Sequence, residues 1–104
     1  MKNTSRCYDP AIDIYEMADS FVVLADVPGI QRDSLDVKVE DSLLMFSGSG
    51  FGSNGEEIGY RKTLNLVNKD GVDVDLVEAN LSDGVLRIDI PKAAKKKSRK
   101  IDVM

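Results

Sequence analysis

The sharpest alternation of hydrophobic and polar residues covers Ala79–Lys92, on both sides of Asp83-Gly84. After the glycine, Leu86, Ile88 and Ile90 occupy every second position, with charged residues between them. This period of two places the apolar side chains on one face of a strand. An Asp-Gly pair suits a two-residue hairpin turn, because both turn positions need a positive φ. The stretch therefore predicts a strand, a tight turn and a second strand that ends at a proline, which has no N–H to donate.

The rest of the chain shows hydrophobic patterns typical of further short strands. Residues 21–27 are apolar except for Asp26, which is typical of a strand covered on both faces, whereas 35–40 has one polar face. The apolar phase shifts by one residue near Asp75, so a break is expected there, with 72–75 forming either a strand or a helical turn. About seven short strands predict an all-β fold, an antiparallel immunoglobulin-like β-sandwich. The predicted strands lie near 12–15, 21–27, 35–40, 43–47, 60–66, 76–81 and 85–90.

Glycine and proline mark the connections between these strands. Pro28-Gly29 predicts a type II turn, in which the glycine takes the positive φ of the second central position. Ser49–Gly59 holds four glycines and few apolar residues, and is predicted to be a flexible loop without a strand. A phosphate-binding loop is the alternative, but the glycine spacing does not match one and no helix is predicted after it.

Charge is distributed unevenly along the 104 residues. Residues 1–91 hold 8 basic and 17 acidic side chains, a net charge of −9, whereas residues 92–104 hold six basic and one acidic, a net charge of +5. The run Lys95–Lys100 is a candidate for binding nucleic acid, acidic lipid or an acidic protein. A solubilising linker is favoured, because the acidic body would repel polyanions and no aromatic residue interrupts the run. We divide the chain into a short flexible N-terminal arm at 1–9, a sandwich domain at 10–92 and a basic C-terminal extension at 93–104.

The composition narrows the chemistry that the chain can perform. It contains no histidine and a single cysteine, Cys7, which removes the usual triad base, Cys-rich zinc sites and an intrachain disulfide. Asp73 and Asp75 could form an acid–base pair or part of a calcium loop, but the remaining ligands of such a loop are missing, so solvated turn carboxylates are favoured. Cys7 is either an incidental thiol or a cross-link between chains. We expect no catalytic residue, no metal or cofactor, and no enzyme activity.

The sequence also predicts the cellular compartment of the protein. No apolar run approaches the roughly 20 residues of a membrane span, and the first nine residues lack the apolar centre of a signal peptide. We therefore expect a cytoplasmic protein that binds neither membrane nor nucleic acid.

Several of these stretches resemble the α-crystallin domain of small heat-shock proteins in their order and spacing. The most specific part is the hairpin, with Ala79, Leu81, Asp83-Gly84-Val85-Leu86, Ile88, Ile90 and Pro91-Lys92. The matching earlier positions are Pro10–Glu16, Phe21–Val27 followed by Pro28-Gly29-Ile30, and Leu44-x-Phe46-x-Gly48. The resemblance covers about 10–92 and the terminal 101–103, and it implies the β-sandwich fold of that family.

Ile101 and Val103 form a short motif of their own. In an extended chain their side chains point to the same side and could enter two pockets, while the backbone adds to the edge of a sheet. The alternative is a frayed terminus with two incidental aliphatic residues. The motif resembles the family's C-terminal anchor, which docks in a groove between two edge strands of a neighbouring subunit. By that resemblance, the groove here would be lined by Leu35, Val37, Val39, Val77, Ala79 and Leu81.

The resemblance implies an ATP-independent molecular chaperone, a holdase that binds partly unfolded proteins through exposed apolar surface and prevents their aggregation. Its partners would be unfolding client proteins and other copies of the chain. The short polar arm at 1–9 and the short loop at 49–59 depart from the family's long apolar arm and longer dimerisation insertion, so a dimer or small oligomer is expected. The alternative is an adaptor similar to CS-type co-chaperones, which share the sandwich topology and dock to a larger chaperone. Suppression of client aggregation by the protein alone discriminates the two.

Overall fold

A computed structural model describes residues 6–68, 70–93 and 103 of the chain. Within these residues the chain forms eight strands and two short 3-10 turns. The strands are β1 (Arg6–Tyr8), β2 (Ile12–Glu16), β3 (Ser20–Asp26), β4 (Asp36–Glu40), β5 (Leu43–Phe51), β6 (Glu57–Asn65), β7 (Glu78–Ser82) and β8 (Val85–Pro91), and the turns are η1 (Arg32–Ser34) and η2 (Val74–Leu76). None of the helical segments in the described part is long and apolar enough to cross a membrane.

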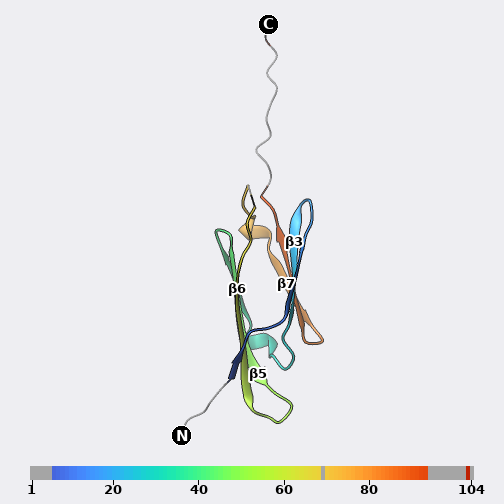
Figure 1. The fold of residues 1–104 in the computed structure, drawn as a ribbon, viewed down its shortest axis with the longest axis vertical. Coiled ribbons are helices and arrows are strands. Elements are labelled where there is room, and N and C mark those ends of the chain that lie inside the picture. Colours follow the sequence, from blue (N-terminus) through green and yellow to red (C-terminus); the bar gives the residue numbers. More distant parts are fainter. Residues whose placement is uncertain (1–5, 69, 94–102, 104) are drawn as a thin grey trace.

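The strands are arranged in two four-stranded sheets that face each other (Figure 1). One sheet has the order β1-β6-β5-β4 and the other has the order β2-β3-β8-β7. Every pairing is antiparallel except that of β1 with β6. The chain crosses between the sheets after β1, as the dark blue segment of Figure 1 shows. The predicted all-β sandwich is therefore confirmed, with eight strands in the described residues where about seven were expected.

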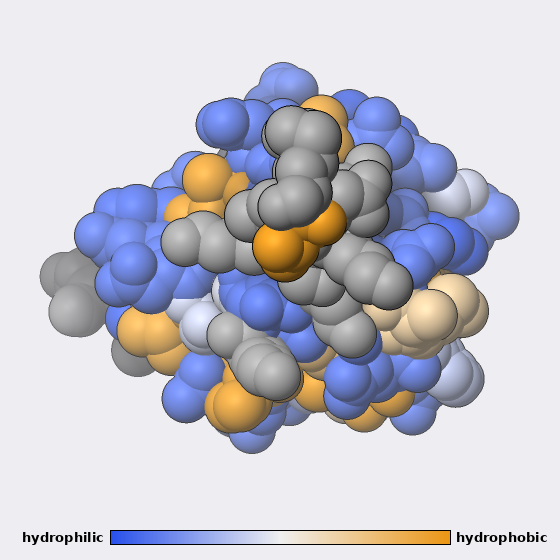
Figure 2. Space-filling model, turned by 90° about the horizontal axis from the view of Figure 1, so that it is seen from above, coloured by the Kyte–Doolittle hydropathy of each residue, from blue (hydrophilic) through white to orange (hydrophobic). Residues whose placement is uncertain are grey.

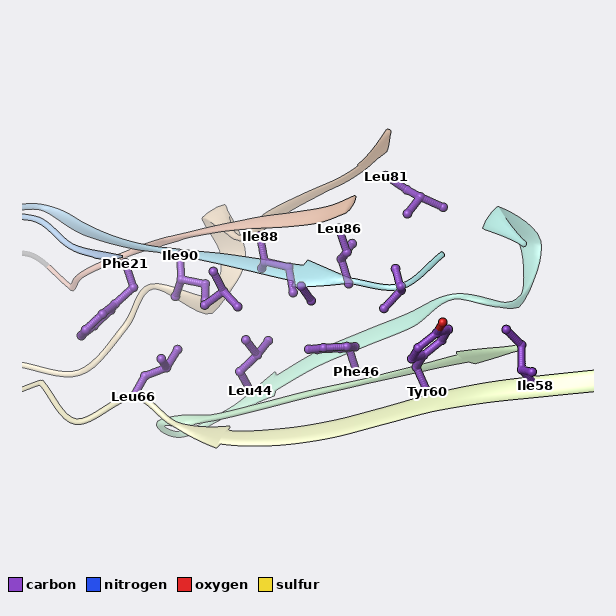
Figure 3. Packing of buried hydrophobic residues seen from close by; sticks show 13 residues of the cluster. Phe21, Leu44, Phe46, Ile58, Tyr60, Leu66, Leu81, Leu86, Ile88 and Ile90 are labelled. Carbon is purple, nitrogen blue, oxygen red and sulfur yellow. The ribbon is translucent and has the colours of Figure 1, made fainter. Parts of the chain in front are cut away.

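The hydrophobic core fills the space between the two sheets (Figure 3). Leu86, Ile88 and Ile90 of β8 are fully buried and face Leu44 and Phe46 of β5 across this space. The alternation of apolar and polar residues in the sequence thus places these side chains on the inward face of each strand. On the outer side of β3 Val22 is buried, at 5% exposed, whereas Leu24 is half-buried and Asp26 is exposed, so the strand is fully covered only on its inner face.

Two predicted turns are confirmed by their backbone angles. Asp83 and Gly84 have φ values of 51° and 78°, as a two-residue hairpin between β7 and β8 requires. Gly29 has a φ of 87°, and the N–H of Ile30 donates to the carbonyl of Val27 at 3.2 Å, which closes the turn after β3. Both turns are thus determined locally, by residues that accept a positive φ.

The segment predicted as a flexible arm contains a strand. Arg6–Tyr8 pairs in parallel with Ile58–Tyr60 of β6, and the rings of Tyr8 and Tyr60 lie 5.9 Å apart. Three residues are too few to show an alternating pattern, so no local feature of the sequence indicates this strand. The exposed edge of β6 positions this strand, because it supplies unpaired backbone N–H and C=O groups.

The prediction of a flexible loop at 49–59 was wrong over most of that range. β5 continues to Phe51 and β6 begins at Glu57, so only residues 52–56 connect them. Gly50 is buried, and a Cβ added there would collide with the carbonyl of Gly29. The N–H of Phe51 donates to that same carbonyl at 3.1 Å. Glycine is needed here because another backbone approaches closely, and not because the segment is flexible.

Candidate functional site: the groove between β4 and β7

Strands β4 and β7 are the edges of their respective sheets and lie on the same side of the sandwich. An edge strand presents unpaired backbone N–H and C=O groups, which can pair with an added strand. The polar residues of β4 are exposed, whereas Val37 and Val39 are half-buried and turn inward. On β7, Ala79 and Leu81 pair with the buried Ile88 and Leu86 of β8, so they also belong to the inward face.

A groove of about 270 Å³ separates the two edges. Four of the six residues predicted for this groove line it, namely Val37, Val39, Val77 and Ala79. Its walls are aliphatic, so it can remove apolar side chains from water, at about 1.5–3 kcal/mol for each fully buried aliphatic side chain. Residues 37 and 39 repeat with a period of two, as do 77 and 79, which matches the spacing of side chains on one face of an extended segment.

Leu35 and Leu81, the other two predicted residues, do not line the groove. Leu81 is only 9% exposed and belongs to the core, and the half-buried Leu35 packs against the core. The guanidinium Nη2 of Arg32 donates to the carbonyl oxygen of Leu81 at 2.8 Å, from η1 to the edge of β7. Arg32 therefore occupies a backbone acceptor that an added strand would otherwise use, and it marks the end of the open edge.

Val74 also lines the groove and is 47% exposed, although it is not among the six residues predicted for it. It lies in η2, the turn that occurs at the predicted break near Asp75. The carboxylate of Asp73 accepts a hydrogen bond from the N–H of Asp75 at 3.3 Å and so caps this turn. The shift of apolar phase around residue 75 was the available signal, because a turn at that point moves Val74 out of the strand and to the groove.

The other singled-out residues lie apart from the groove or outside the described part of the chain. Val103 is described and is 94% exposed, whereas Ile101 and the basic run 95–100 lie outside the described residues. Cys7 is an exposed free thiol on β1. The groove therefore has the composition of a binding surface, with walls that carry no titratable group.

Two groups elsewhere have shifted pKa values, and each has a local cause. Burial raises the pKa of Tyr60, with a further contribution from nearby Tyr8, and its hydroxyl donates to the carbonyl of Pro28 at 2.8 Å. The hydrogen bond to Asp89 raises the pKa of Arg87 on the outer face of β8. Neither residue lines the groove.

Further apolar surface is exposed at the end of the sandwich where β2 joins β3 and where η2 lies. Val67, Leu76 and Met17 are each more than half exposed. Seen from this end, hydrophobic residues form separate patches between hydrophilic ones (Figure 2). Scattered patches of this kind are ordinary on a protein surface, so the groove is the better-defined candidate site.

Comparison with known proteins agrees with the fold and with the sequence patterns. Residues 13–104 match the model of the Hsp20/alpha crystallin family. The chain is 35% identical over 99 residues to the 18 kDa antigen 2 of Mycobacterium avium, across 88% of this chain and 72% of that protein. It is 30% identical over 104 residues to the 18 kDa heat shock protein of Clostridium acetobutylicum, across 88% of this chain and 69% of that protein.

A solved structure shows the same architecture. The structure of a small heat-shock protein from Xylella fastidiosa, described as having a distinct high order structure, superposes with a TM-score of 0.75. It is 27% identical in sequence, and the match covers 93% of this chain and 97% of that chain. The two-sheet topology, the family match and these relatives together establish that the chain belongs to the Hsp20/alpha crystallin family of small heat-shock proteins.

Proposed function

We propose that this protein is an ATP-independent holdase, and that the groove between β4 and β7 binds extended apolar segments. The observation that carries the proposal is the aliphatic groove itself, open between two sheet edges. A segment with apolar residues at every second position can place them between the two walls while its backbone pairs with an edge. Burial of apolar surface drives such binding, so no nucleotide is needed.

The same groove is proposed to bind the Ile101-x-Val103 anchor and to hold a dimer or small oligomer together. The two aliphatic residues of the anchor have the spacing that the groove walls share. Anchor and client would then compete for one site, so that self-association regulates how much groove is open. We also propose that the protein acts in the cytoplasm on unfolding proteins. The single cysteine supports that location, because the fold does not depend on a disulfide.

The experiment is suppression of thermal aggregation of a model client by the purified protein, with and without ATP. Ala79→Glu places a charge in the groove, whereas Asn80→Glu adds the same charge at the next residue, which is exposed and on the opposite face of β7. We expect the wild type and Asn80→Glu to suppress aggregation equally without ATP, and Ala79→Glu to lose most of the effect. Failure of the wild type alone would favour the adaptor function, and equal activity of both variants would remove the groove from the proposal.

A further inference from the structure

The outer face of the β1-β6-β5-β4 sheet contains a hollow of about 370 Å³ that crosses three strands and shares no lining residue with the groove. Gly59 of β6 lines this hollow, paired with Cys7 of β1 on one side and with Ser49 of β5 on the other. Arg61, two residues further along β6, pairs with Ser47 of β5. Both of these β6 residues alternate with buried positions, so they belong to the outward side of the sheet.

Gly59 differs from the other glycines of the chain, all of which lie in described segments. Of the 8 glycines, four have a positive φ, and at three others an added Cβ would overlap a neighbouring group. At Gly59 neither reason applies, because the atom nearest to an added Cβ, the carbonyl oxygen of Gly48, would lie at an ordinary contact distance of 3.4 Å. Glycine inside a strand is destabilising, and it marks places where a ligand or another backbone approaches closely. The glycine therefore indicates an approach to β6 by a group from outside the described residues.

Two arginines line the same hollow, Arg6 from β1 and Arg61 from β6. Both are exposed, and neither side chain forms an ion pair or a hydrogen bond with another described residue. The hydroxyls of Ser47 and Ser49 likewise have no partner in the described part of the chain. Every other cation within 6–68 and 70–93 has such a partner, namely Arg32, Lys38, Lys62, Arg87 and Lys92. The hollow thus collects unused hydrogen-bond donors, two of them charged, which indicates an anionic ligand.

The donors of the hollow match a phosphate group better than a carboxylate. A guanidinium forms paired hydrogen bonds with either anion. A phosphate monoester carries a charge of about −1.5 to −2 at neutral pH and three strong acceptor oxygens, whereas a carboxylate has one charge and two oxygens. Two guanidinium groups and two serine hydroxyls therefore suit the phosphate in both charge and number of acceptors. The missing side chain at Gly59 lets the phosphate approach the backbone of the sheet.

The hollow is open on the face of the sheet, since Cys7, Ser49 and Arg61 are all exposed. A site for a small molecule encloses about 70–90% of its ligand, which an open hollow cannot do. A phosphate carried by a larger partner gains further contacts around the hollow. This openness favours a phosphorylated side chain over a free phosphate compound.

We propose that the hollow binds a phosphoserine or phosphothreonine side chain of a partner protein. Arg6 and Arg61 pair with the phosphate, and the hydroxyls of Ser47 and Ser49 donate hydrogen bonds to its oxygens. The hollow lies on the outer face of one sheet, so this binding is independent of the groove between β4 and β7 and of its occupants. It gives the chain a second recognition surface, one that selects for a modification and not for apolar sequence.

The experiment titrates a fluorescent peptide, Ala-Ala-phosphoserine-Ala-Ala, into the full chain and follows binding by anisotropy. Matched peptides carry serine or glutamate in place of the phosphoserine, and inorganic phosphate serves as the competitor. We expect the phosphopeptide to bind about tenfold more tightly than the glutamate peptide, because it has more charge and more acceptors, and the serine peptide not to bind. Equal binding of the phosphoserine and glutamate peptides would overturn the choice of phosphate. Inorganic phosphate that binds as tightly as the phosphopeptide would overturn the choice of a partner protein.

Two arginine variants test the charges of the hollow. Arg61→Gln should weaken binding of the phosphopeptide about tenfold, because it removes a charged hydrogen-bond donor, and Arg6→Gln should act in the same direction. The matched control is Arg87→Gln, which removes the same charge from an exposed strand position in the other sheet and should change binding less than about twofold. The basic run at 95–100 is present in all of these proteins, so binding by that run would be equal in all of them. Equal binding by Arg61→Gln and Arg87→Gln would therefore overturn the proposal.

Gly59→Val fills the floor of the hollow. The neighbouring atoms leave room for a Cβ, and valine suits a strand, so the midpoint of urea unfolding should be unchanged or higher while binding of the phosphopeptide is lost. A glycine that serves only the fold predicts the reverse. A lower midpoint together with unchanged peptide binding would overturn the proposal.

Cys7 reports the position of the bound peptide. It is the only cysteine of the chain, its thiol is exposed, and it lines the hollow beside Gly59. A saturating concentration of the phosphopeptide should slow alkylation of this thiol by iodoacetamide, because the bound peptide covers it, and the serine peptide should leave the rate unchanged. An alkylation rate that stays the same when the phosphopeptide is bound would place the peptide elsewhere on the molecule and overturn the proposal.

Discussion

The two long sides of the sandwich differ in how their edge strands are connected. On the side of β2, lysines at inward positions connect the elements: Lys62 pairs with Asp9 at 2.9 Å, and Lys92 pairs with Glu16 at 2.9 Å. On the side of β4 and β7, the inward positions carry valine and alanine, and a groove remains between the edges. A lysine can cover apolar surface with its stem and still bring its ammonium to solvent, which a valine cannot do.

This difference teaches that the two sides of one sandwich can be closed to different extents. Both sides begin with the same problem, two sheet edges with core between them. One side is bridged by the chain that crosses from β1 to β2 and carries charged pairs, and the other leaves aliphatic walls accessible to a bound segment. The comparison predicts that changes on the bridged side affect stability, whereas changes in the groove affect binding.

The largest expected effect comes from the core that both sides share. Phe46→Ala removes a buried ring and should lower the free energy of unfolding by about 3–5 kcal/mol, since Phe46 is 2% exposed. Phe51→Ala, on the same strand but 48% exposed, is the matched control and should have a much smaller effect. Urea unfolding followed by circular dichroism measures both. Similar losses for the two variants would contradict the assignment of the core.

A smaller loss is expected on the bridged side. The ammonium of Lys92 donates to Glu16 and to the carbonyl of Met17 and lies 5.0 Å from the ring centre of Phe21. Lys92→Ala should cost about 1–2 kcal/mol of unfolding free energy and leave suppression of client aggregation unchanged. Lys38→Ala, on the open side, should cost almost nothing, because its pair with Glu40 is exposed. A loss of activity in Lys92→Ala without unfolding would contradict the division between the two sides.

The raised pKa of Tyr60 predicts that the stability of the fold depends on pH. Tyr60 belongs to the core and does not line the groove. Because its pKa is raised above the ordinary value of 10.0, the unfolded chain loses this proton first as pH increases. The contribution of Tyr60 to stability should therefore be fully present below pH 10.0 and should be lost as the pH increases above it. Tyr60→Phe should lose about 1 kcal/mol at neutral pH with its hydrogen bond and show a weaker alkaline decline. An unchanged alkaline slope in urea titrations would contradict the assignment.

The smallest effect is expected at the end of the open edge. Arg32→Gln removes the hydrogen bond to the carbonyl of Leu81 and should cost at most about 1 kcal/mol of unfolding free energy, while the groove walls stay in place. Arg87→Gln, whose partner Asp89 lies on the outer face, serves as the control and should not change the urea midpoint measurably. A decrease in client binding by Arg32→Gln would show that Arg32 acts on the groove itself.

The sequence predicted the parts of the fold that are decided locally. The hairpin at Asp83-Gly84, the turn at Gly29 and the break near Asp75 all depend on residues within a few positions of one another. It missed features that depend on distant backbone. β1 forms only because the edge of β6 is available, and Gly50 continues β5 because Gly29 approaches it.

The candidate site was likewise predicted only where residues close in the sequence decide the structure. Alternation along β4 and β7 identified Val37, Val39, Val77 and Ala79. The packing of the two sheets decides whether each remaining inward residue belongs to the core or faces the groove. No linear pattern could specify that Leu35 and Leu81 pack into or against the core. For Val74, which reaches the groove through η2, the shift of apolar phase near Asp75 was the available signal.

The most direct measurement of the central claim is the native mass of the particle, by light scattering, for four full-length proteins. These are the wild type, Ala79→Glu, Asn80→Glu, and Ile101→Ser/Val103→Ser. Docking of the tail in the groove between β4 and β7 predicts a dimer or small oligomer for the wild type and Asn80→Glu, and a monomer for the groove and anchor variants. A wild type that is strictly monomeric, or an oligomer that persists when the groove and the anchor are altered, would contradict it.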